Sequence, residues 1–338
     1  MSAPHDRLGR PLTDLRVSVT DRCSLRCAFC MPADRDYEFL PRAELLTYEE
    51  MTRLVRLFIG LGVTKVRLTG GEPLLRRDLP RLVSMLAALP GIDDLALTTN
   101  GVLLTRDAAA LRAAGLARVT VSLHSLREET FDRLSGSRGQ LPAVLAGIEA
   151  AAAAGLTPVK VNAVVVRGVN DGEVVELARH FNRPGFVLRF IEYMDVGTVN
   201  GWQPTGVVAA DEILARVGAA LPLAPAPRRS PHDVALRYRY LEGGGELGVI
   251  ASVSQPFCGD CSRARLTADG SLFTCLFGVA GHDLKAPLRG GASDGELQAR
   301  IAAIWRERAD RYSEERAVRL GAGAPEPPSR VEMFRIGG

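Results

Sequence analysis

The stretch Cys23-Ser24-Leu25-Arg26-Cys27-Ala28-Phe29-Cys30 carries three cysteines at the spacing C-x3-C-x2-C, directly after a strand-like apolar run at 15–19. Soft thiolate ligands select zinc or an iron–sulfur cluster. A tetrahedral zinc site usually needs a fourth ligand, and neither His nor Cys lies nearby in the sequence to supply it. A disulfide would leave one cysteine over. The stretch therefore predicts a [4Fe–4S] cluster held through three irons, with the fourth iron open.

Apolar runs alternate along the chain with segments of helical period. A T-x-x-E capping box at 47–50 begins one helix, which ends at Gly60. The expected strands lie at 15–20, 65–69, 95–99, 119–123, 159–166 and 186–191, and further helices at 78–89, 106–114, 140–154 and 171–181. Six strands alternating with helices predict a parallel α/β sheet, and six units favour a partial (βα)6 barrel of the TIM type. In such barrels the chemistry lies at the C-terminal strand ends.

The remaining cysteines form a second triplet, Cys258-x2-Cys261-x13-Cys275. A second three-cysteine [4Fe–4S] cluster with an open iron is the favoured interpretation. A Cys3His zinc site completed by His282 is the alternative.

The composition changes near residue 195, from regular alternation to loops, a Pro-rich linker at 222–231 and short strands. We therefore expect a barrel at 1–195, a C-terminal domain with the second cluster at 196–324, and a tail at 325–338. The tail begins with prolines and then becomes apolar at 331–336, which is unusual for a frayed end. Gly337 and Gly338 have no side chains, so they could enter a crowded cavity and lie against a site arginine.

The chain of 338 residues is 46% hydrophobic, enough for a full core. Its net charge of +3 is too small to indicate nucleic-acid binding by itself. The longest apolar runs are too short to span a bilayer, and residues 1–10 lack the apolar core of a signal peptide. Together with reduced cysteines, these features predict a cytoplasmic protein with neither a membrane nor a nucleic-acid partner.

The first cysteine motif, with an aromatic residue before its last Cys, resembles the radical S-adenosylmethionine (SAM) superfamily. Together with the second triplet, the run C-S-R-A-R-L-T-A-D-G at 261–270 and the glycines at 337–338, the chain resembles the GTP 3′,8-cyclase family of molybdenum cofactor biosynthesis. The resemblance covers nearly the whole chain, from Asp14 onward. It implies a lyase that uses SAM and two [4Fe–4S] clusters to convert GTP to (8S)-3′,8-cyclo-7,8-dihydroguanosine 5′-triphosphate. It also implies that GTP lies between the clusters and that the second open iron ligates the guanine.

The resemblance assigns roles to individual positions of this chain. The cluster ligands are Cys23, Cys27 and Cys30 for the first cluster, and Cys258, Cys261 and Cys275 for the second. The SAM contacts are Phe29, Gly71, Glu72, Ser122 and Met194. The GTP contacts are Arg16, Arg67, Thr98, Lys160, Arg263 and Arg265. The resemblance also implies catalytic roles for Arg263, Arg265, Gly337 and Gly338. Phe29 stands where the family commonly has Tyr, but the contact is through backbone, so we expect no loss of function.

The residues themselves give partial support for the triphosphate site. A single arginine in this Arg-rich chain is ordinarily a solvated surface charge. Arg16, Arg67, Thr98 and Lys160 each lie in or beside an expected strand, where a surface role is less natural, and Arg189 could join them. If the stretch after the second cluster is extended, Arg263 and Arg265 point to one face.

Two other functions remain open from the sequence. A radical SAM peptide-modifying enzyme with an auxiliary cluster usually carries more C-terminal cysteines than this chain has. A zinc ribbon that binds nucleic acid would need a basic surface near 258–275, where there is little excess charge. The favoured interpretation implies an electron donor of flavodoxin or ferredoxin type and a following enzyme that makes cyclic pyranopterin monophosphate. It is compatible with a homodimer.

Overall fold

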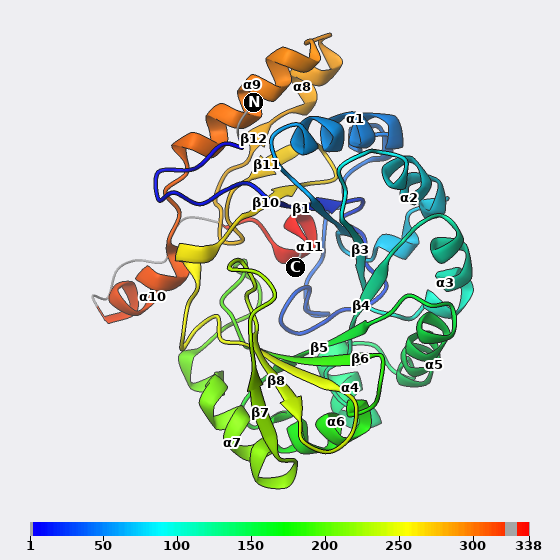
Figure 1. The fold of residues 1–338 in the computed structure, drawn as a ribbon, viewed down its shortest axis with the longest axis vertical. Helices are drawn as coiled ribbons and strands as arrows, with labels where there is room; N and C mark the ends of the chain where they lie inside the picture. Colours follow the sequence, from blue (N-terminus) through cyan, green and yellow to red (C-terminus); the bar gives the residue numbers. More distant parts are fainter. Residues whose placement is uncertain (1–2, 322–329, 338) are drawn as a thin grey trace.

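Eight parallel strands form the wall of an open barrel in the computed structural model, which describes residues 3–321 and 330–337 (Figure 1). The first six strands stand side by side in chain order, β10 pairs with β1 at one edge, and β9 pairs with β6 at the other. These eight strands are β1 (Asp14–Ser18), β2 (Lys65–Thr69), β3 (Asp94–Thr99), β4 (Arg118–Ser122), β5 (Val159–Val165), β6 (Phe186–Glu192), β9 (Glu246–Ile250) and β10 (Arg263–Leu266). In the described residues no pairing joins β9 to β10, so the barrel stays open there.

Antiparallel strands extend the sheet beyond both edges of the barrel. They are β7 (Leu223–Ala226) and β8 (Leu236–Tyr240) on the β9 side, and β11 (Ser271–Phe273) and β12 (His282–Asp283) on the β10 side. The chain after residue 195 therefore adds strands to both ends of the barrel sheet.

Helices cover the outer face of the barrel (Figure 1). Those between the barrel strands are α1 (Tyr48–Ile59), α2 (Leu79–Ala87), α3 (Leu104–Ala113), α4 (Glu128–Ser135), α5 (Leu141–Ala153) and α6 (Val174–Phe181). The C-terminal ones are α7 (Ala210–Ala220), α8 (Lys285–Arg289), α9 (Asp294–Glu307), α10 (Tyr312–Gly321) and α11 (Met333–Ile336). Among the described residues, no helix is both long and apolar enough to cross a membrane.

The expected parallel α/β architecture with six strand–helix units is confirmed. The strand expected at 65–69 has those bounds, and the capping box at Thr47 is formed, with Glu50 as its partner. Thr47 accepts a hydrogen bond from the Glu50 amide, and the Glu50 carboxylate accepts one from the Thr47 amide. The sequence interpretation did not include α4 or α9.

Along the barrel strands, outward apolar side chains alternate with inward polar ones, and this explains why the barrel encloses a polar space. In β1 and β2 the outward positions carry Val17 and Val66, which are buried against the helices. The inward positions carry Arg16 and Arg67, which stand opposite each other in the parallel register. Because successive strand residues point to opposite faces, an apolar outer layer and a polar interior follow from one pattern.

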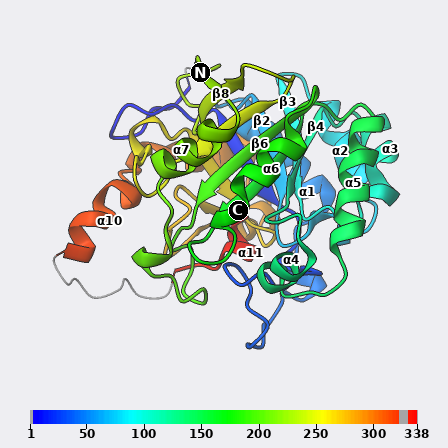
Figure 2. The same cartoon turned by 90° about the horizontal axis from the view of Figure 1, so that it is seen from below.

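The segment 330–337 returns to the barrel, and α11 lies over the centre of the barrel in the view along its opening (Figure 1). Phe334 and Ile336 are buried there. The ring of Phe334 meets Tyr37 and Phe39 edge to face, with centroids 5.4 and 6.3 Å apart. By contrast, α10 projects from the body of the molecule in both views (Figure 2).

Candidate active site

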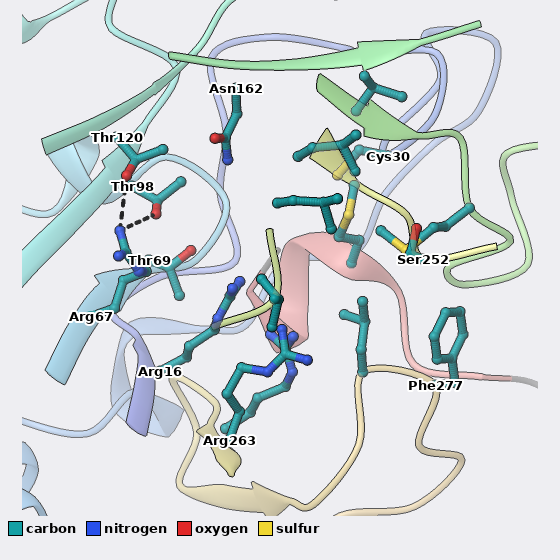
Figure 3. Close-up of a pocket in the computed structure, with 18 of the residues that line it drawn as sticks. Arg16, Cys30, Arg67, Thr69, Thr98, Thr120, Asn162, Ser252, Arg263 and Phe277 are labelled. Carbon is teal, nitrogen blue, oxygen red and sulfur yellow. Dashed lines mark hydrogen bonds between the residues drawn. The ribbon is translucent and has the colours of Figure 1, made fainter. Parts of the chain in front are cut away.

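One cavity inside the barrel is lined by all six cysteines, none of which forms a disulfide. The first triplet follows β1. In the second, Cys258 and Cys261 lie in the connection from β9 to β10 at the open seam, and Cys275 follows β11. Figure 3 shows Cys30, Arg16 and Arg263 directed into this space. The fold therefore brings two cysteine groups more than 200 residues apart into a single chamber.

The first cysteine loop is fixed from two sides. The amides of Arg26 and Ala28 donate to the carbonyls of Ser135 and Leu134, at 2.8 and 3.0 Å, at the end of α4. A Cβ at Gly136 would come within 2.1 Å of the Arg26 carbonyl, so a side chain there would block this approach. The helix that the sequence interpretation missed is thus a support of the first cysteine loop.

The turn at Gly70-Gly71 holds the other side of that loop. A Cβ on Gly70 would lie 2.3 Å from the carbonyl oxygen of Thr20, and one on Gly71 would lie 2.3 Å from that of Arg22. The Gly71 amide donates to Thr20 at 2.8 Å. Glycine is required here because two backbones meet without room for a side chain.

The thiols of the first triplet lie in a medium that disfavours their ionisation. Burial raises the pKa of Cys23 to about 11 and that of Cys27 to about 12, and it also raises the pKa of Cys30. The Asn100 amide group donates to the Cys23 sulfur at 3.8 Å. Thiolates in this environment need cations to stabilise them, so three half-buried cysteines with a nearby amide donor fit a cluster of iron and sulfide.

The charge environment of the second triplet is not uniform, because burial and the Asp310 carboxylate raise the pKa of Cys275 to about 11. Burial alone would raise the pKa of Cys261, but Arg263 and Arg308 outweigh that effect and lower it to about 6. Arg263 donates to the Cys261 sulfur at 3.4 Å, and the Phe277 amide donates to the Cys275 sulfur at 3.5 Å. N–H donors aimed at sulfur are among the groups that tune protein-bound iron–sulfur clusters. The residues of the second triplet therefore also fit a cluster.

The zinc alternative finds no support in the geometry. His282 is exposed on β12, and the cavity lined by the cysteines does not include it. Among residues 3–321 and 330–337, no three His, Cys, Asp or Glu side chains converge closely enough to hold a single metal ion. A tetrahedral zinc site needs such convergence, whereas a cluster distributes its ligands over separate irons.

Four of the five positions matched to SAM line the cavity, namely Phe29, Gly71, Ser122 and Met194. Glu72 is placed differently: its side chain is fully buried outside the cavity lining. Its carboxylate accepts hydrogen bonds from the Thr99 hydroxyl and the Asn100 amide, each at 2.7 Å. These oxygens hold the loop that presents Asn100 to Cys23, so the predicted SAM contact at Glu72 rests on its backbone carbonyl rather than on its carboxylate.

Of the positions matched to GTP, all but Lys160 line the cysteine cavity. Lys160 lines a second chamber at the N-terminal end of the barrel strands. Arg16, Arg67, Arg189 and Arg263 line both chambers. The two chambers therefore meet at a layer of arginines.

These cations have few partners within the protein. Arg67 donates only to two hydroxyls, Thr98 at 3.3 Å and Thr120 at 3.0 Å (Figure 3). The side chains of Arg16 and Lys160 make no hydrogen bond or ion pair within the described residues. Partial burial and then neighbouring cations lower the pKa of all three groups, to about 9 for Arg67 and to about 6 for Lys160. Half-buried cations without matching anions indicate a site for a polyanion.

The tail segment contacts the site through Gly337. The Arg265 guanidinium donates a hydrogen bond to the Gly337 carbonyl. Gly337 has φ +78°, and a Cβ there would lie 2.4 Å from Thr69 Cγ2 and 2.9 Å from the Ser18 hydroxyl. Gly338 and the proline-containing lead-in at 322–329 lie outside the described residues.

Sequence reasoning missed several residues that line the cavity, including His124, Asn162, Arg10 and Arg308. His124 is buried, which lowers its pKa to about 4, and its ring accepts the Val164 amide at 3.1 Å and meets Phe29 edge to face. Asn162 stands opposite Ser122 and Arg189 in the strand register, and its side-chain oxygen has no partner among the described residues. The i, i+2 spacing from Lys160 was the only available signal for Asn162.

Comparison with known proteins gives two family matches that follow each other along the chain. Residues 17–181 match the radical SAM superfamily, and residues 186–314 match the family described as Molybdenum Cofactor Synthesis C. Together they cover both cysteine triplets.

Curated relatives cover almost the full chain. A protein of Acidothermus cellulolyticus named GTP 3′,8-cyclase is 58% identical, over 93% of this chain and 88% of its own. Proteins of the same name from Xanthomonas axonopodis pv. citri and Aquifex aeolicus are 52% and 49% identical and are aligned over at least 98% of both chains. Among solved structures, Streptococcus suis SuiB superposes with a TM-score of 0.58 at 15% identity, over 89% of this chain and 67% of that one. The SuiB likeness shows the fold alone.

Proposed function

Since the chain belongs to the GTP 3′,8-cyclase family of the radical SAM superfamily, we propose that its barrel converts GTP to 3′,8-cyclo-7,8-dihydro-GTP, an early step of molybdenum cofactor biosynthesis. The observation that carries this proposal is the cavity that combines two cysteine triplets with half-buried cations that lack anionic partners. The triplets suit two clusters, and the cations suit a nucleoside triphosphate.

We assign the first triplet to the cluster that binds SAM. The cluster and SAM, once bound and given one electron, would supply a 5′-deoxyadenosyl radical to take the hydrogen from ribose C3′ of GTP. C3′ would then bond to C8 of guanine, and a further electron and a proton would complete the 7,8-dihydro product. The protein holds the cysteine loop on α4 and the Gly70-Gly71 turn, and it presents Ser122 and Met194 to the same cavity. Because these groups line a cavity inside the barrel, they would limit the access of water to the reacting atoms.

We assign the second triplet to a [4Fe–4S] cluster for the substrate, and the cationic layer to the triphosphate. Arg263 and Arg265 extend from β10 beside Cys261, while Arg67 and Lys160 lie toward the second chamber. A GTP molecule with its base at the second triplet and its phosphates among these cations would span the two chambers. The main contribution of the protein is then to hold C3′ and C8 at a distance suitable for bond formation.

The barrel also needs a source of single electrons and a consumer of its product. We propose a donor of flavodoxin or ferredoxin type, and a following enzyme that makes cyclic pyranopterin monophosphate. Metal and product analysis after anaerobic reconstitution tests the whole assignment. We expect iron and sulfide for two clusters, and cyclised GTP when SAM, GTP and a reductant are present. Formation of 5′-deoxyadenosine without any change in GTP would instead support a peptide-modifying enzyme.

A further inference from the structure

We propose that Asp6, Arg10 and Arg308 form a buried charged unit that holds the second cysteine loop and sets the reduction potential of the cluster bound there. The inference rests on the second cluster of the proposed function. None of the three residues belongs to the cysteine motifs or to the positions matched to SAM or GTP.

Arg10 ties the N-terminal segment to the second cysteine loop. Its Nε donates to the Asp6 carboxylate at 2.5 Å, and its Nη1 donates to the carbonyls of Cys258 and Asp310, each at 2.8 Å. The Trp305 indole donates to the Arg10 carbonyl at 3.1 Å. Side-chain exposure is 2% for Arg10 and 0% for Asp6, so this ion pair is removed from solvent.

Arg308 makes the corresponding contact with the next cysteine of the triplet. Its Nη1 donates to the Cys261 carbonyl at 2.6 Å and to the Asp6 carboxylate at 3.2 Å. Its guanidinium stacks over Trp305 at 4.5 Å, and its side chain is 1% exposed. The carbonyls of both cysteines thus accept from buried arginines that share one carboxylate.

The balance of charge in this unit is positive. Two buried guanidinium groups share the single carboxylate of Asp6, whose other oxygen accepts the amides of Leu8 and Arg10. Asp310 lies 3.5 Å from Arg308 Nε, but its side chain is 35% exposed, so solvent weakens its effect. A buried excess cation is costly unless an anion compensates it.

Two buried N–H groups of the unit indicate that the compensating anion lies in the cavity of the second triplet. Arg10 Nη2 is buried and has no hydrogen-bond partner among the described residues, and the buried Arg308 Nε has only the longer 3.5 Å ion pair with Asp310. Both side chains line the cavity that holds the second triplet. Hydrogen bonds and net charge at the sulfurs set the potential of an iron–sulfur cluster, and a nearby cation stabilises its reduced, more negative form. The unit should therefore raise the potential of the second cluster.

The inference can be tested on the reconstituted protein with two variants that change the charge of the unit in opposite directions. Arg308→Met removes a positive charge, and Asp6→Asn removes the negative charge while keeping the shape of the side chain. An EPR-monitored redox titration should show a second-cluster midpoint that is more negative in Arg308→Met and more positive in Asp6→Asn. Arg308→Lys, which keeps the charge, should stay near wild type in potential. Chelator-driven iron loss from the second site should be about 10-fold faster in Arg308→Met.

Arg7→Met is the matched control, because Arg7 lies in the same segment but its side chain is 61% exposed and pairs with Glu307 on the surface. It should leave both midpoints unchanged. If Arg308→Met and Asp6→Asn shift the midpoint in the same direction, or not at all, the electrostatic inference is wrong. If the second cluster is lost from Arg308→Met but kept in Arg308→Lys, the holding role is supported. If wild type itself binds only one cluster, the proposed function fails at the second site, and this outcome is distinct from unchanged potentials.

Discussion

Replacing Gly337 with alanine should release the tail segment from the barrel while leaving the cysteine loops in place. The backbone there has φ +78°, where a non-glycine residue costs about 1–3 kcal/mol. The added Cβ would also overlap Thr69 Cγ2 at 2.4 Å, and relieving such crowding in a packed site costs about 1–3 kcal/mol. The sum is about 2–6 kcal/mol, so the equilibrium constant for docking of the tail should fall at least about 30-fold. Arg265 would then lose its carbonyl acceptor.

Hydrogen exchange across 330–337 measures the release directly, and trypsin cleavage at the exposed Arg335 measures it independently. We expect faster exchange and cleavage in Gly337→Ala, with strongly reduced cyclisation and a full complement of iron. Gly168→Ala is the matched control, since Gly168 has φ +71° but no atom lies within 4 Å of its Cβ position. It shares the backbone strain without the crowding at the site. Unchanged protection of the tail in Gly337→Ala would refute the reasoning.

Four further outcomes can be measured. Cys27→Ser should abolish 5′-deoxyadenosine formation, and wild-type levels would overturn the assignment of the first triplet. Cys261→Ser should still cleave SAM to some extent but not cyclise GTP, and normal cyclisation would make the second triplet structural. Arg67→Ala should weaken GTP binding about 10-fold or more while SAM affinity changes little, because its guanidinium is buried and faces only hydroxyls. The surface variant Arg53→Ala should change neither affinity, and equal losses in Arg67→Ala would indicate misfolding. Lys160 has a pKa of about 6 in the empty site, so it should take up a proton when GTP binds. The affinity for GTP should therefore fall as pH rises above 6 in wild type. It should fall less in Lys160→Met.

Local patterns made much of the barrel predictable from the sequence. The Thr47 capping box and the alternation in β2 act within a few residues, so they are visible without tertiary context. The helix α4 was missed because Arg127, at its N-cap, makes no side-chain capping bond there, and the helix buries few apolar residues. The pairing of β9 with β6 and of β10 with β1 was also missed. The pairing register between two strands that are far apart in the sequence leaves no periodic signal in the sequence of either strand.

In the candidate site too, some features could be predicted from the sequence and others could not. Cysteine spacing is local, so both triplets could be recognised in the sequence. Arg10 and Arg308 could not, because an arginine in an Arg-rich chain resembles a surface charge until the fold shows that it is buried. Glu72 shows the converse problem: the motif placed it at a ligand, but its carboxylate is occupied by neighbouring donors. Sequence motifs locate a loop well, but the direction of each side chain depends on the packing around it.

The unpaired cations also explain how the barrel can favour its substrate. Burial lowers the pKa of Arg67 and Arg189, which means that the empty site holds their charges at a cost. In most barrels of this type the interior is filled by apolar side chains that stabilise the fold. Here the inward positions carry cations instead, so part of that stabilisation is absent until a polyanion enters. Binding of a triphosphate relieves the repulsion at several strands at once, and that relief is available only to a ligand that reaches the arginine layer between the two chambers. The same arrangement that weakens the empty barrel therefore selects for a nucleoside triphosphate over a nucleoside.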